Sequence, residues 1–175
     1  MLVGFVSGGP RWLIEAAGQD RSELWRDFHR FGERGDAKRW LCTNILQAEI
    51  DPSDAEPVAL PVTLSDLRTV LAEIEAYACE EGCTYFADGC ASAAQALTRR
   101  TVEDAPRLAD IRRCIGFSDV QLKALQAINH AGICGGIGSW NDLGVGGERY
   151  DNLSERLFAA VKVSIASLAN STYCS

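Results

Sequence analysis

Residues able to do nucleophilic chemistry gather in one short stretch of the second half of the chain. His130 is a potential base, Cys134 and Ser139 are potential nucleophiles, and Asp142 is a carboxylate that could orient the base. A Cys–His pair or a Ser–His–Asp set supports covalent catalysis. No GxSxG turn is present, however, and near neighbours in sequence seldom form a triad. A small hydrolase or transferase centred on His130, Cys134 and Asp142 is therefore an alternative, and we expect that the protein is not an enzyme.

Cysteine is the second residue type that could carry chemistry. The seven cysteines are Cys42, Cys79, Cys83, Cys90, Cys114, Cys134 and Cys174. Their odd number, without a secretory signal, argues against a disulfide framework. Cys79, Cys83 and Cys90 could bind zinc with Cys114 or His130 as the fourth ligand, but the spacing C-x3-C-x6-C matches no common zinc motif. We expect structural thiols, no metal and no other cofactor.

Acidic charge is concentrated in one segment of this 175-residue chain, whose formal net charge is −7. Between residues 49 and 88 the only basic residue is Arg68, and the ten acidic residues are Glu49, Asp51, Asp54, Glu56, Asp66, Glu73, Glu75, Glu80, Glu81 and Asp88. On an expected helix at 64–81, Asp66, Glu73 and Glu80 recur every seven residues and so form one row beside the buried face. Packing does not require such a row.

The acidic segment therefore predicts a docking surface for a cationic partner, because complementary charge speeds encounter and rejects wrong partners. Its predicted contact residues are Asp51, Asp54, Glu56, Asp66, Glu73, Glu75, Glu80 and Glu81. The alternative is a solvated face that only keeps the protein in solution. Acidity argues against a nucleic-acid binder. No apolar run reaches the roughly 18 residues that span a bilayer, and no signal peptide is recognisable, so we expect a cytoplasmic protein without a membrane partner.

A glycine-rich loop at 132–147 is the other unusual feature, with seven glycines in sixteen residues. Trp140, Asn141 and Asp142 at its centre offer an aromatic platform and polar groups, and we include them among the predicted partner-binding residues. The loop has no GxxxxGK[ST] or GxGxxG pattern, which argues against phosphate binding. The alternative is a helix-to-helix connection in which Trp140 packs into the core.

The elements that must position these residues read as mostly helical. Apolar spacing and caps predict helices at 20–31, 36–48, 64–81, 88–100, 107–114, 118–128 and 151–170. Thr63 with Asp66 and Ser118 with Gln121 have the spacing of capping boxes, and Gly82 is the predicted end of the helix at 64–81. Cys42, Thr43 and Ile45 would also suit a strand, as would residues 1–6. Three of the five prolines make 51–63 an extended acidic connector. We expect a mostly α, single-domain compact bundle of six or seven helices over residues 1–175, with room for one short N-terminal strand.

Two segments in the C-terminal part of the chain are similar to a known class of proteins. The segments GGIGSWND (135–142) and YDNLSERLFAAVKVSIASLANS (150–171) resemble small bacterial immunity proteins, which neutralise polymorphic or contact-delivered toxins by binding them. The resemblance implies a non-enzymatic protein that occludes the active site of a cognate toxin. Many such toxins are basic nucleases, which agrees with the acidity. A further alternative is a helical scaffold, in which the apolar face of the last helix self-associates across a two-fold axis.

Overall fold

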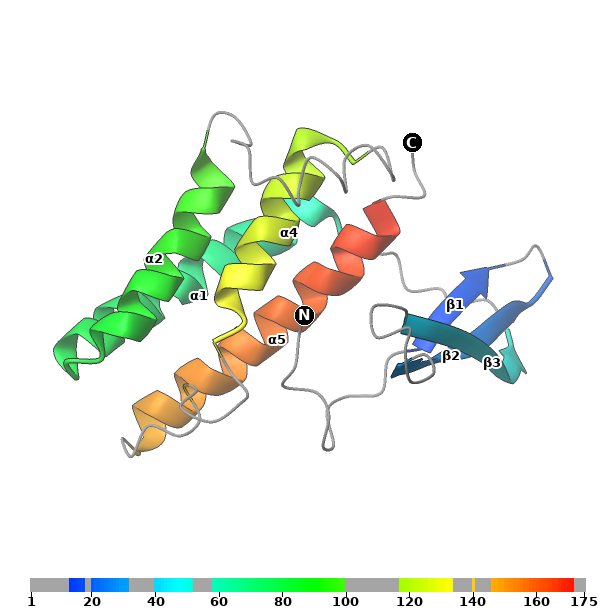
Figure 1. The fold of residues 1–175 in the computed structure, drawn as a ribbon, viewed down its shortest axis with the longest axis horizontal. Coiled ribbons are helices and arrows are strands. Elements are labelled where there is room, and N and C mark those ends of the chain that lie inside the picture. Colours follow the sequence, from blue (N-terminus) through cyan, green and yellow to red (C-terminus); the bar gives the residue numbers. More distant parts are fainter. Residues whose placement is uncertain are drawn as a thin grey trace. The chain divides into compact units, whose positions relative to one another are not determined.

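The computed structural model describes residues 13–17, 20–31, 40–51, 58–99, 117–133, 140 and 146–171. Within these ranges the chain forms a three-stranded sheet and four helices (Figure 1). The chain divides into two compact units. The sheet unit comprises residues 5–56, and the helical unit comprises residues 57–175 with residues 1–4. The expectation of a single domain stays a prediction.

The sheet unit is a meander of three antiparallel strands in the order β1 (Leu13–Ala17), β2 (Ser22–Phe31) and β3 (Trp40–Ile50). In its register, Arg26 of β2 stands between Leu13 of β1 and Ile45 of β3. Ala48 and Leu46 face the successive residues Leu24 and Trp25, so Gln47 is an additional residue that forms a bulge in β3. Strand β3 therefore pairs with β2 without interruption from Trp40 to Leu46, and the pairing resumes after the bulge.

The predicted helices at 20–31 and 36–48 are wrong, because this region is β-sheet. Leu24 and Phe28, four residues apart, suggested a helix, but an even spacing also places both on one face of a strand. Trp25 supplies apolar surface to the opposite face, and this hides the alternation expected of a half-buried strand. The strand alternative for Cys42, Thr43 and Ile45 is confirmed, since all three lie in β3.

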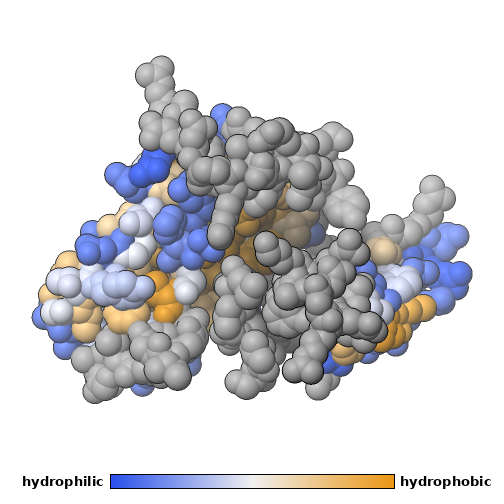
Figure 2. All heavy atoms as spheres, in the orientation of Figure 1, coloured by the Kyte–Doolittle hydropathy of each residue, from blue (hydrophilic) through white to orange (hydrophobic). Residues whose placement is uncertain are grey.

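Apolar side chains remain at the surface of the sheet unit. Leu13, Ile14, Phe28, Ile45 and Leu46 are each at least 40% exposed. Figure 2 shows apolar residues of the strands at the molecular surface. Ser22 is the one buried residue among the described residues whose side chains are placed in this unit.

The helical unit is built from α1 (Leu60–Glu80), α2 (Thr84–Thr98), α4 (Asp119–Ala131) and α5 (Glu148–Ser171). Helix α1 packs against α2 and α5, and α4 packs against the same two helices. The core is made of side chains from all four helices, including Leu67, Ile74, Cys90, Leu122 and Leu157. None of the helices in the described ranges is both long and apolar enough to cross a membrane.

The mostly helical prediction is confirmed, but the described residues hold four helices rather than six or seven. The predicted helix at 107–114 and the strand at 1–6 lie outside the described residues. The predicted connector at 51–63 is too long, because α1 begins at Leu60 with Pro61 in its first turn. Proline is accepted there because the first N–H groups of a helix have no intrahelical acceptor.

Two predicted helix ends are confirmed at atomic detail. Ser118 caps α4, with its Oγ accepting a hydrogen bond from the Gln121 N–H at 3.3 Å while Gln121 Oε1 accepts from the Ser118 N–H at 2.8 Å. Gly82 ends α1 with φ +73°, and the Cys83 N–H reaches back to the Ala78 carbonyl at 2.7 Å. The predicted cap formed by Thr63 and Asp66 is wrong, since the N-cap is Ala59 and Thr63 Oγ1 donates to the Leu60 carbonyl.

Candidate protein-binding surface

The predicted acidic contact residues are distributed over both units. Asp66, Glu80 and Glu81 are exposed on α1 and at its C-cap, and Glu73 and Glu75 on the same helix are partly exposed. Asp51 is exposed at the end of β3 in the sheet unit. Asp54 and Glu56 lie outside the described residues. Within the helical unit, the candidate surface is therefore formed by the carboxylates of α1 and its C-cap.

Two members of the predicted row are paired inside the helical unit. Glu73 accepts two hydrogen bonds from the guanidinium of Arg156, one of them at 2.8 Å from Nη2 to Oε1. Glu80 is paired in the same way with Arg149, with 3.3 Å between Nη2 and Oε1. The guanidinium hydrogen bonds lower the pKa of both carboxyl groups, and the carboxylates raise the pKa of both arginines.

These pairs correct the expectation that packing does not require the row, because they join α1 to α5. The sequence contains a spacing pattern that indicates these ion pairs, and the prediction did not use it. Arg149 and Arg156 are seven residues apart in the sequence, as are Glu73 and Glu80. Arg149 pairs with Glu80 and Arg156 pairs with Glu73, which is the order expected of antiparallel helices. Each pair is about half exposed, so its net contribution to stability is modest.

The remaining carboxylates leave α1 and its C-cap negative. Asp66, Glu75 and Glu81 form no ion pair with any other residue in the described ranges. The acidic residues of α1 and its C-cap are Asp66, Glu73, Glu75, Glu80 and Glu81, and the basic residue of this helix is Arg68. Even with Glu73 and Glu80 paired with arginines of α5, an excess of negative charge remains on α1 and its C-cap.

Trp140 is fully buried in the helical unit, which is the packing alternative rather than the predicted exposed anchor. Its Nε1–H donates to Ser154 Oγ at 2.8 Å, and its backbone N–H donates to the Ile133 carbonyl at 3.0 Å. The hydroxyl of Tyr150 donates to the backbone carbonyl oxygen of Trp140 at 2.5 Å. Every polar group of Trp140 is thereby satisfied without water, and the side chain is not available to a partner.

Aromatic rings surround Trp140 from three elements. Tyr150 stacks on the indole with 5.2 Å between centroids, while Phe86 and Tyr77 approach it edge-on at 5.6 and 6.1 Å. These contacts fix one point of the 132–147 loop against α1, α2 and α5. Arg149 lies over the Tyr77 ring at 5.0 Å, so the ion pair with Glu80 borders this cluster. Burial raises the pKa of Tyr77, which keeps its hydroxyl neutral.

Of the residues of the catalytic alternative, His130 is the one that lies in the described part of the chain. His130 is exposed in the last turn of α4. Cys134, Ser139, Asn141 and Asp142 lie outside the described residues. The hydrolase or transferase alternative accordingly has no described geometry to support it.

The three cysteines of the zinc alternative are dispersed. Cys79 is exposed on α1, Cys83 is half-buried at the turn that follows, and Cys90 is buried in the core through α2. Across the described ranges, no group of three or more histidine, cysteine, aspartate or glutamate side chains is arranged to hold a metal ion. Cys114 lies outside these ranges.

Comparisons with protein-family models, curated proteins and solved structures found no match to this chain. The resemblance to immunity proteins accordingly stays a prediction.

Proposed function

We propose that this chain is a non-enzymatic binding protein of the immunity type, which neutralises a basic protein toxin by covering its active site. The observation that carries the proposal is the set of exposed and partly exposed carboxylates on α1 and its C-cap. Asp66, Glu75 and Glu81 have no basic partner among the described residues, so their charge is open to solvent and to a cationic surface. Asp51, Asp54 and Glu56 add to the acidic segment that precedes α1.

The physical role of these charges is to direct the encounter. A negative surface raises the local concentration of a basic partner and speeds association, and added salt weakens this effect. Glu73 and Glu80 support the surface differently, because their arginine pairs hold α1 against α5. Reversing Glu73 or Glu80 would place two cations together between these helices, so neither residue is suitable for testing partner contact.

The first experiment is capture of partners from the native cell lysate at low and high salt, with the full chain as bait. We expect one stoichiometric basic protein whose retention falls at high salt, and whose activity is inhibited by the purified chain. Failure to capture any basic protein at low salt would overturn the proposal, as would capture of a basic protein that retains full activity in the complex.

The second experiment places the contact on α1. The double variant Asp66→Lys/Glu81→Lys should slow association with the captured partner roughly tenfold at low salt. The control Asp88→Lys/Glu155→Lys also reverses two exposed carboxylates of the helical unit and makes the same change in net charge. Equal slowing by the two double variants would show that net charge alone acts, and would remove the α1 surface from the proposal.

A further inference from the structure

Strand β3 lies at an edge of the sheet that the described strands form. Among the described strands it borders β2 alone, so alternate backbone N–H and C=O groups along its other side point away from the sheet. Every residue from Thr43 to Glu49 is exposed. Protein edges are usually protected by lysine, proline or very short strands, and β3 has eleven residues and neither lysine nor proline.

The bulge at Gln47 defines which part of this edge can accept another strand. Before it, Trp40–Leu46 pairs with β2 without interruption. This segment, WLCTNIL, contains no charged residue, no glycine and no proline. Glu49, the one charged residue of β3, lies beyond the bulge and is paired with Arg21 across the sheet at 2.7 Å.

The order of residues in this segment is self-complementary around Thr43. In an antiparallel pairing centred on Thr43, Leu41 stands opposite Ile45 of a second copy, and Trp40 stands opposite Leu46 of that copy. Two threonines then meet at the centre. Aromatic–aliphatic pairs, aliphatic pairs and Thr–Thr pairs are all favourable when directly opposite. The register also keeps the two copies of Glu49 at opposite ends of the paired region.

The other edge of the sheet lacks this property. Strand β1 has only five residues, and Glu15 is at its centre. An antiparallel pairing of β1 about its central residue would set two glutamates opposite each other, which is unfavourable.

From these observations we propose that a second copy of this chain pairs with β3, antiparallel and about a two-fold axis at Thr43, to give a continuous six-stranded sheet. The proposal is independent of the proposed function. The paired segment is only about 23 Å long, from seven residues at about 3.3 Å each, so the dimer is weak and depends on concentration. Since each copy has a net charge of −7, salt screens their repulsion and tightens the dimer. Binding of a basic partner responds to salt in the opposite direction.

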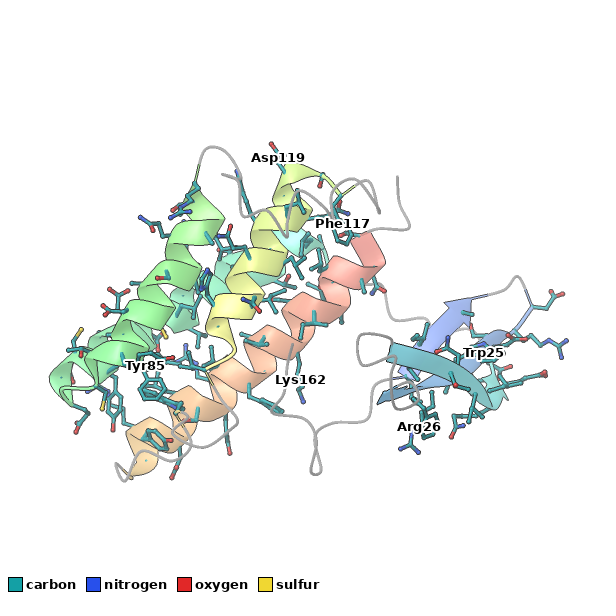
Figure 3. The ribbon with its side chains drawn as sticks, viewed as in Figure 1. Trp25, Arg26, Tyr85, Phe117, Asp119 and Lys162 are labelled. Carbon is teal, nitrogen blue, oxygen red and sulfur yellow. The ribbon has the colours of Figure 1, made fainter. Side chains whose placement is uncertain are left out.

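Analytical ultracentrifugation of the full chain over a concentration series tests the proposal. We expect a reversible monomer–dimer equilibrium that shifts toward dimer in higher salt. A Thr43→Glu chain should dimerise roughly tenfold more weakly, because like charges meet at the axis. The same substitution suits its own sheet, because Thr43 faces Phe28 on β2 and the guanidinium of Arg26 lies 4.5 Å from the Phe28 ring. Figure 3 labels Arg26 on the sheet.

Two further variants test whether the two-fold axis of the dimer lies at Thr43. Thr43→Lys should also dimerise more weakly, and an equimolar mixture of the Thr43→Lys and Thr43→Glu chains should recover dimer as a heterodimer. Leu13→Glu is the matched control, since Leu13 is also exposed and directly faces Arg26, but on the β1 edge. That control should dimerise like the unmodified chain.

Three results would overturn the proposal. The unmodified chain could remain monomeric at every concentration and salt level. Leu13→Glu could weaken the dimer as much as Thr43→Glu does, which would place the contact elsewhere. The mixture of oppositely charged Thr43 variants could also fail to recover dimer while each variant retains the circular dichroism of the folded chain. None of these results bears on capture of a basic partner.

Discussion

At the scale of single residues, Trp140 is held in the helical unit by aromatic contacts and by the hydrogen bond of its indole N–H. Its ring is surrounded by Tyr150, Phe86 and Tyr77, and its indole N–H is bonded to Ser154. A loop rich in glycine has little conformational preference of its own, so a buried aromatic side chain is an effective means of attaching it to the helices. The tryptophan that looked like a partner anchor is therefore an internal anchor.

Replacing Trp140 should be among the most destabilising changes in the helical unit. Trp140→Ala should cost about 3–5 kcal/mol of unfolding free energy, because a large buried ring is lost. Ser154→Ala should cost about 1–3 kcal/mol, since it leaves the indole N–H buried without an acceptor. Urea unfolding followed by circular dichroism measures both values.

Tyr85→Ala is the control for these two variants. Tyr85 is an aromatic residue of the same unit that is 78% exposed (Figure 3). Its loss should change the unfolding free energy by about 0.5 kcal/mol or less. If Trp140→Ala cost no more than Tyr85→Ala, Trp140 would not be an internal anchor.

At the scale of elements, the turn between α1 and α2 depends on one glycine. Gly82 has φ +73°, which L-residues with a side chain rarely adopt, and the hydrogen bond from Cys83 to Ala78 depends on this conformation. A Cβ on Gly82 would meet no atom within 4 Å. The cost of a substitution there is therefore conformational rather than steric.

Two glycine-to-alanine substitutions should change the unfolding free energy in opposite directions. Gly82→Ala should destabilise the protein by about 1 kcal/mol because of its positive φ. Gly89→Ala should stabilise it by about 0.5–1 kcal/mol, since Gly89 lies inside α2 and its new Cβ would make an ordinary 3.4 Å contact with Ile133. Thermal or urea unfolding of both variants checks this. Stabilisation by Gly82→Ala would contradict the assigned helix end.

At the scale of the whole molecule, the two ion pairs between α1 and α5 make stability depend on pH. The pKa values of Glu73 and Glu80 are lower in the folded chain than in the unfolded one, because each carboxylate accepts guanidinium hydrogen bonds. Their contribution is fully present above the unfolded pKa of about 4.3 and is lost as the pH falls through the lower folded values.

The double variant Glu73→Gln/Glu80→Gln should therefore be less stable than the unmodified chain at neutral pH, with the difference shrinking in acid. Urea unfolding at a series of pH values from neutral to acidic measures this convergence. The control Glu81→Gln/Glu155→Gln removes the same charge from exposed positions that have no ion pair with a described residue. A constant difference across the whole pH range would show that the arginine pairs do not stabilise the fold.

Features that arise from neighbouring residues could be predicted from the amino-acid sequence. The apolar stripes of α1, α4 and α5, the cap at Ser118 and the end of α1 at Gly82 were predicted because each involves interactions within about five residues. Net charge and the acidic segment need no structure at all. The start of α1 was predicted four residues late, because Pro61 reads as a breaker unless the first turn of a helix is recognised.

Contacts between segments that are distant in the sequence became known from the three-dimensional fold. Strands β2 and β3 pair across the chain from 22 to 50, and this pairing outweighs the helical spacing of Leu24 and Phe28. Glu73 meets Arg156 and Trp140 meets Phe86 because the helices bring them together. The local sequence around a carboxylate or an indole is the same whether the side chain contacts solvent, a partner protein or the core of its own chain. The difference lies in long-range packing, which local spacing does not contain.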